Sequence, residues 1–158
     1  MRKNVLCTTL IVPVFIATLA GCGSSNKSGT AAIQQFITQE NTSINTINKD
    51  FTAESSLIKA VSTKQISYTS FKSSYEKDQS ATQKEINILT AAKAPKGAEA
   101  YQKEYVSLLN EGLHVFADQE ASVRPDRTLD KTKSQQVSQE LKTFIQNFQD
   151  VAAKYGVK

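Results

Sequence analysis

The sequence predicts an all-α fold, an antiparallel up-down four-helix bundle that follows a flexible tether. Apolar residues recur at alternating three- and four-residue steps in four stretches, which is the period of an amphipathic helix. No stretch of the sequence shows the strict alternation that marks a half-buried strand. The 158 residues include only six glycines and three prolines, so few helix breakers interrupt the four stretches. Helices of about 25 to 32 residues joined by short loops fold most simply as such a bundle.

The first helix is predicted over residues 31–61. This helix has the most interrupted apolar stripe of the four, so the alternative fold is three packed helices with a detached first one. Seven residues make up the stripe: Ile33, Ile37, Ile44, Ile47, Phe51, Ile58 and Val61.

The second helix is predicted over residues 68–93, and its start is well marked. Ser67 is a suitable N-cap, because its hydroxyl can accept a hydrogen bond from a free backbone N–H of the first turn. Ile66 and Phe71 then occupy the two positions of a hydrophobic staple. The stripe of this helix carries Tyr68, Phe71, Tyr75, Ile86 and Leu89.

Pro95 and Gly97 separate the second helix from the third. Pro95 suits the first turn of a helix, because its ring presets φ and its missing N–H is not needed there. The third helix is expected to end near Arg124, since Pro125 disfavours helical geometry in the residue before it. Its stripe carries Tyr101, Tyr105, Leu108, Leu109, Phe116 and Val123.

The fourth helix is predicted to begin near Asp126 or Thr128, and it has the cleanest apolar seam. Gly156 is placed to end it in the left-handed conformation that glycine adopts without strain. The seam consists of Val137, Leu141, Phe144, Phe148, Val151 and Tyr155.

The N-terminus has the pattern of an export signal. Arg2 and Lys3 precede an apolar run over residues 5–20. That run is shorter than the roughly 20 residues that a membrane-spanning helix needs, and Pro13 weakens it further as a permanent anchor. The segment is therefore predicted to be removed after export.

The run ends in Leu19-Ala20-Gly21-Cys22, which resembles the lipobox of bacterial lipoproteins. The resemblance covers residues 1–22 and implies that the Cys22 sulfur receives a diacylglyceryl group and that the chain is cut before it. It implies a removed signal peptide over residues 1–21, a lipidated Cys22 with a flexible tether over 22–30, and a helical-bundle domain over 31–158. Two or three acyl chains, such as palmitate, hold a protein on a membrane without a spanning helix. The expected location is thus the extracytoplasmic face of the cell membrane.

The cysteine content and the charge of the chain argue against disulfide bonds and against nucleic-acid binding. Cys7 would leave with the signal and Cys22 would carry lipid, so no disulfide is expected. Exported domains without disulfides are common among Gram-positive lipoproteins, which favours that kind of host. Loss of Arg2 and Lys3 lowers the formal net charge from +4 to +2, and the remaining charge is spread along the chain. That pattern does not indicate nucleic-acid binding, which needs clustered lysine and arginine.

One spacing is typical of a metal site. Glu111 and His114 form a Glu-x-x-His pair, as in di-iron four-helix proteins, but the chain has one histidine in total and those sites need two such pairs. Helical phase also places His114 about 170° from the apolar stripe of its helix, on the solvent side. No catalytic triad and no phosphate-binding glycine loop is present. We therefore expect neither an enzyme nor a cofactor.

The unusual feature is a set of carboxylates near the apolar seams. Glu40 falls at the centre of the first stripe, and Asp78 occupies a seam step of the second helix. Glu54 and Glu85 lie near the stripe edges. A carboxylate that faces a core is costly unless it is paired or hydrogen-bonded. These groups either form a ligand or cation site inside the bundle, or are satisfied by tyrosine hydroxyls, lysine stems or water and fix the helix register.

A specific contact follows from the bundle geometry. Glu40 and Tyr105 both lie about ten residues above the same end of their helices, and both face the core by phase. We therefore predict that the hydroxyl of Tyr105, or failing that of Tyr101, lies near the Glu40 carboxylate.

Two classes of function remain open. The first is a non-enzymatic lipoprotein that binds another envelope or membrane protein, as an exclusion, immunity or accessory factor would. The alternative is a lipoprotein that binds a small ligand or cation with Glu40, Asp78, Tyr101 and Tyr105 inside the bundle.

Overall fold

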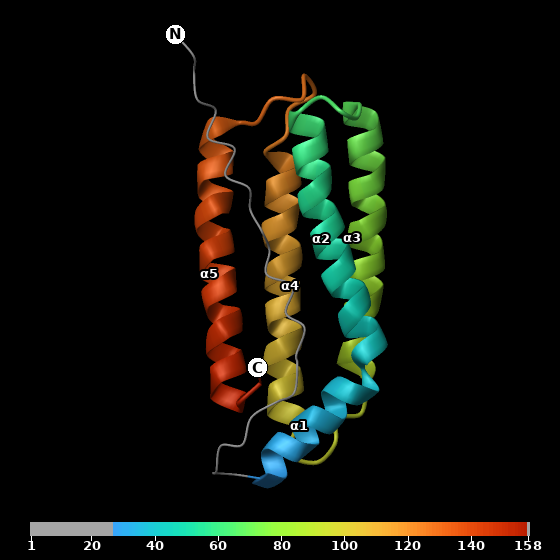
Figure 1. Cartoon of the computed structure of the whole chain (residues 1–158), viewed down its shortest axis with the longest axis vertical. Coiled ribbons are helices and arrows are strands. Elements are labelled where there is room, and N and C mark those ends of the chain that lie inside the picture. The colour runs from blue at the N-terminus through green and yellow to red at the C-terminus, as the bar shows by residue number, and fades with distance from the viewer. Residues whose placement is uncertain (1–26, 158) are drawn as a thin grey trace.

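The computed structural model describes residues 27–157, which form a bundle of five α-helices. They are α1 (Lys27–Gln39), α2 (Asn41–Ser62), α3 (Tyr68–Ala91), α4 (Glu99–Ala121) and α5 (Lys131–Tyr155). Consecutive long helices, α2 to α5, run in opposite directions and pack side by side (Figure 1). The predicted all-α class is confirmed, with five helices in place of four. Within the described part of the chain, no helix is both long and apolar enough to cross a membrane.

The predicted first helix is divided in two at Glu40. The backbone angles of Glu40, φ −98° and ψ 13°, depart from helical values, and this residue separates α1 from α2. The sequence around the break, Thr38 to Ser43, is a run of polar residues whose side chains compete for backbone hydrogen bonds. The single helix over residues 31–61 was thus a wrong prediction, because apolar spacing alone does not register such a break. α1 also begins at Lys27, so the last four residues of the predicted tether are helical.

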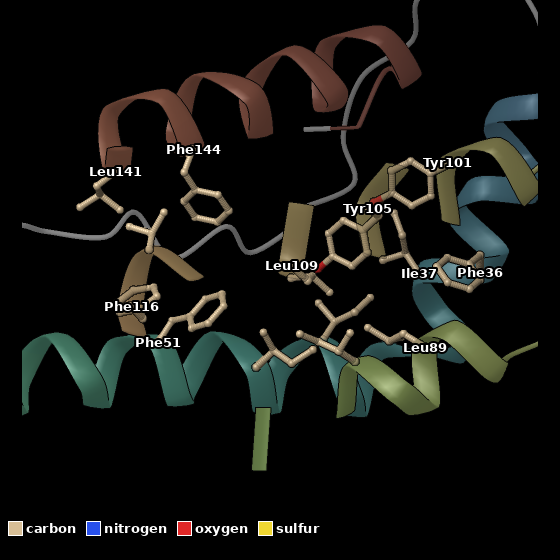
Figure 2. Packing of buried hydrophobic residues seen from close by; sticks show 14 of the residues in the cluster. Phe36, Ile37, Phe51, Leu89, Tyr101, Tyr105, Leu109, Phe116, Leu141 and Phe144 are labelled. Carbon is tan, nitrogen blue, oxygen red and sulfur yellow. The ribbon is translucent and has the colours of Figure 1, made fainter. Parts of the chain in front are cut away.

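α1 turns away from the bundle axis and crosses the end at which α4 begins and α5 ends (Figure 1). Phe36 is completely buried there, and its ring meets Tyr101 edge-on at 6.1 Å between centroids. Tyr101 in turn packs edge-on against Tyr155 from the last turn of α5. Figure 2 shows Phe36 and Ile37 reaching from α1 toward the Tyr101 end of the core. α1 therefore closes this end of the bundle.

The helix ends agree in part with the sequence. The Ser67 hydroxyl accepts a hydrogen bond from the Ser70 backbone N–H at 3.0 Å, and Gly156 ends α5 in the left-handed conformation at φ 65°, so both predicted caps are confirmed. α4 begins at Glu99, after Pro95 rather than on it, and α5 begins only after Asp130.

The later start of α5 follows from a hooked loop over residues 122–130. Val123 and Leu129 form an isolated antiparallel bridge across it. The Arg124 guanidinium pairs with the Asp130 carboxylate at 2.8 Å, and the same carboxylate caps α5 by accepting from the Lys133 N–H. These local bonds compete with helix in residues that the sequence assigned to the fourth helix.

Aromatic rings fill the middle of the core. Phe51 of α2 stacks on Phe116 of α4 at 4.6 Å, and Phe144 of α5 meets Phe51 edge-on (Figure 2). Gly112 lets α4 approach these rings, because a Cβ there would lie 3.0 Å from Phe144 and 3.1 Å from Phe51.

Candidate functional site

The seam between α2 and α3 contains the bundle's one fully buried carboxyl group among the described residues. In α2 the buried positions step through Ile47, Phe51, Glu54 and Val61, so Glu54 takes a core position in an otherwise apolar series. Its side chain is 0% exposed, and neither carboxyl oxygen has a hydrogen-bond partner within the described part of the chain. A buried acid without partners is costly when ionised.

Three further residues lie along the same α2–α3 seam, and we call the four together the acidic seam: Asp50, Glu54, Asp78 and Thr82. Thr82 of α3 is completely buried, and its hydroxyl donates to Asp50 Oδ2 of α2 at 3.2 Å. Asp78 lies one helical turn before Thr82 and is half-buried. The antiparallel pairing of α2 with α3 therefore brings two carboxyl groups of α2 next to one of α3.

Burial and like charges both favour the protonated acid at Glu54. Burial, followed by the charges of Asp78 and Asp50, raises the pKa of Glu54 to about 8. Burial also raises the pKa of Asp50, where the hydrogen bond from Thr82 opposes the effect and the charges of Asp78 and Glu85 add to it. Burial raises the pKa of Asp78 as well, and the charge of Lys77 offsets part of that rise. At neutral pH the seam therefore holds Glu54 mainly as a neutral acid.

Tyr75 adjoins the acidic seam on α3 and is also completely buried. Its hydroxyl donates to the backbone carbonyl of Phe116 on α4. Burial and the charges of Glu54 and Glu120 raise the pKa of the Tyr75 hydroxyl, so it stays protonated and committed to that carbonyl. Tyr75 is thus not a donor to Glu54.

The predicted contact between Glu40 and Tyr105 is not formed. Glu40 lies half-exposed at the α1–α2 junction, where its side chain makes no capping hydrogen bond. The break at Glu40 changes the helical phase on which the prediction depended. Glu40 also lies about four turns before Glu54 along α2. The structure therefore does not bring Glu40 together with Asp78.

Tyr101 and Tyr105 are core residues, as predicted, but they belong to an aromatic group. Their rings stack on each other at 5.6 Å, and Tyr105 meets Phe148 edge-on. Burial raises the pKa of both hydroxyls. The four residues of the predicted internal site thus occupy three separate places: a junction, an aromatic stack and the acidic seam.

A groove of about 590 Å³ lies between α4 and α5 on the outside of the bundle. It contains three carboxylates and one histidine but no lysine or arginine. The lining residues are Ser107, Asn110, Glu111, His114, Val115, Asp118, Gln139, Glu140 and Thr143. We call this the α4–α5 groove.

The polar groups of the α4–α5 groove are only partly satisfied. Glu111 accepts two hydrogen bonds from the Asn147 side chain, at 2.9 and 3.2 Å. Glu140 Oε1 accepts from Gln136 at 2.8 Å, whereas its buried Oε2 has no partner within the described part of the chain. A groove with this lining suits a positively charged or hydrogen-bond-donating group.

His114 is exposed, as its helical phase predicts. Within residues 27–157, no three histidine, cysteine or carboxylate side chains are placed to hold a metal ion. The predicted lipidation site, Cys22, and the signal before it lie outside the described residues.

Comparison with known proteins gives no further assignment. No family model, no curated protein and no solved structure matches the chain.

Sequence reasoning placed Glu54 at a stripe edge and did not predict the groove. The signal for Glu54 was present, since it falls on the 47–51–54–58–61 series of three- and four-residue steps within α2. One phase averaged across the break at Glu40 hid that position. The groove depends on the packing of α4 against α5, which spacing within one helix does not specify.

Proposed function

We propose that this chain is a membrane lipoprotein, anchored through Cys22 on the extracytoplasmic face, whose helical bundle is a non-enzymatic binding module for another envelope protein. The observation that carries the proposal is the order of Arg2 and Lys3, an apolar run, and Leu19-Ala20-Gly21-Cys22. A short tether after Cys22 would then hold the five-helix bundle near the membrane surface. That arrangement favours contact with neighbours in the same membrane.

The α4–α5 groove supports the binding half of the proposal. It opens on the outer face of the bundle and presents Glu111, Asp118 and Glu140 without a basic residue. Ile88 and Leu129 are the exposed large hydrophobic residues of the described chain, and they lie on different segments, α3 and the loop before α5. A partner segment with lysine or arginine side chains therefore fits this bundle better than an apolar one.

The alternative, an internal ligand site, has less support. It needed Glu40 and Asp78 to meet Tyr101 and Tyr105, and these residues lie in separate places.

The anchor is tested by labelling cells with a fatty-acid probe. We expect the full chain to carry the label and Cys22→Ser to lose it and to leave the membrane fraction. A mutant that keeps the label would contradict the assignment of Cys22.

The binding surface is tested by crosslinking in native membranes with two matched charge reversals. Asp118→Lys changes the α4–α5 groove, whereas Asp150→Lys changes an exposed residue of α5 outside it. We expect a specific crosslinked protein with the wild-type chain and with Asp150→Lys, and its loss with Asp118→Lys. Equal capture by both variants would exclude the groove as the binding surface.

A further inference from the structure

The acidic seam leaves one group without a structural role. Glu54 takes a core position in α2 where an apolar side chain would pack without cost, and both its oxygens lack a partner within the described residues. Replacing a buried charged group by an apolar one of similar volume is often stabilising. A neutral Glu54 is tolerated far better than an ionised one, because an isolated buried carboxylate is strongly disfavoured.

The charged groups that act on Glu54 among the described residues do not stabilise its ionised form. Its own helix places Asp50 one turn before it, and α3 places Asp78 and the neutral Tyr75 against it. Lys77 acts on Asp78 rather than on Glu54.

The titratable side chains of α4 at this level point elsewhere. Glu111 bonds with Asn147, Glu120 pairs with Lys72, and His114 and Asp118 line the α4–α5 groove. From α5, the ring that reaches α2 is that of Phe144. Among the described residues, then, every formal charge that acts on Glu54 is negative.

In the observed geometry a metal ion does not offset the charge of an ionised Glu54, since no three carboxylates of the described chain converge on one point. Separation of α2 from α3 would do so, because water would then reach both oxygens. Thr82, buried opposite on α3, would be exposed by the same movement.

We propose that the α2–α3 seam is a proton-dependent latch, closed while Glu54 is a neutral acid and loosened when Glu54 ionises. Only the contact between α2 and α3 depends on whether Glu54 is protonated. The packing of α4 against α5 is the same in both states. The latch makes the exposure of the α2 and α3 inner faces depend on the pH outside the cell membrane, where the proposed function places the bundle.

Hydrogen exchange of backbone amides in the full chain tests the latch. Wild type, Glu54→Gln and Glu54→Met are compared at the same pH, so that intrinsic exchange rates cancel. At pH 5 we expect similar exchange in all three, because each presents a neutral side chain. The Glu54 pKa is about 8 in the closed bundle and returns toward its ordinary 4.5 once water reaches the carboxyl group. At pH 9 we therefore expect amides around Glu54 and Thr82 to exchange roughly 100-fold faster in wild type than in Glu54→Met. Glu54→Met covers the possibility that the glutamine amide, also without partners, destabilises the fold.

One control variant and three contrary results decide the outcome. Glu40→Gln removes a half-exposed acid at the α1–α2 junction and should behave as wild type at both pH values. Equal exchange in wild type and Glu54→Met at pH 9 would overturn the proposal, as would a change of the same size throughout α5. Restored protection of wild type at pH 9 by Mg²⁺ or Ca²⁺ alone would also overturn it, since a cation and not a proton would then close the seam.

The protonation state has its own spectroscopic signature. At pH 6 the infrared C=O stretch of a protonated carboxylic acid should be present in wild type and reduced in Glu54→Gln. An unchanged band would mean that Glu54 is ionised in the closed bundle and that no latch exists.

Discussion

The α2–α3 and α4–α5 pairs are both antiparallel, but they place their carboxyl groups differently. Between α2 and α3, Glu54 is enclosed without a partner. Between α4 and α5, the half-exposed acids each have a partner: Glu111 bonds with Asn147, and Glu104 accepts from Lys154 at 2.6 Å and from Tyr155 at 3.0 Å. Glu140 accepts from Gln136 through one oxygen, and only its other oxygen lacks a partner among the described residues. The interior of the α4–α5 pair is left to Phe116 and Phe144. Two helix pairs of the same geometry are therefore expected to depend on different interactions, one on the protonation of Glu54 and the other on ring packing.

The largest effect should come from the ring-packed pair. Phe144→Ala removes a ring that packs against Phe51 and Phe148 and lies close to the backbone of Gly112. We expect a loss of about 3–5 kcal/mol in the free energy of unfolding, as for other buried phenylalanines. Urea unfolding at pH 7 measures it. A loss below 1 kcal/mol would mean that the rings do not hold α4 to α5.

In the acidic seam, replacing the buried acid should stabilise the bundle, whereas Phe144→Ala destabilises it. The stability that a neutral Glu54 provides is fully present below its ordinary pKa of 4.5 and is lost as the pH rises to about 8. Glu54→Met should therefore raise the free energy of unfolding at pH 8 by roughly 2–4 kcal/mol and do little at pH 4. Urea unfolding of both proteins between pH 4 and pH 9 checks this. A constant difference across that range would remove the contrast between the two pairs.

A smaller effect should follow at Gly112, where close approach is required. Its Cβ would lie within 3.2 Å of two rings, so Gly112→Ala should cost about 1–3 kcal/mol despite the better helix propensity of alanine. Thermal unfolding measures it. A stabilised variant would show that the rings yield freely at this point.

The smallest effect is expected at the rim. Lys154 is exposed, and its pair with Glu104 is the kind of surface ion pair that contributes little. Lys154→Ala should leave the urea midpoint unchanged within error. A clear drop would mean that rim pairs hold α4 to α5 as much as the rings do.

The sequence predicts the features of this comparison that lie within one helix. Apolar spacing gave the all-α class, Ser67 and Gly156 gave two helix ends, and phase placed His114 in solvent. Each depends on residues a few positions apart, where backbone geometry alone decides the outcome.

Helix breaks, loops and contacts between helices were not predictable in the same way. The break at Glu40 results from a polar run that has no proline or glycine to mark it. The acidic seam needs the register of α2 against α3, and the loop over 122–130 needs the pairing of Arg124 with Asp130. The predicted Glu40–Tyr105 contact was wrong because the break at Glu40 changes the helical phase of that residue.

Whether the α2–α3 pair encloses a neutral acid can be measured by NMR titration of the Glu54 carboxyl carbon in the full chain. Assignment by comparison with Glu54→Gln identifies the signal. We expect a midpoint near pH 8, because burial and the charges of Asp78 and Asp50 favour the protonated form. A midpoint at the ordinary value of 4.5 would show that Glu54 is solvated and that the α2–α3 pair does not enclose a neutral acid.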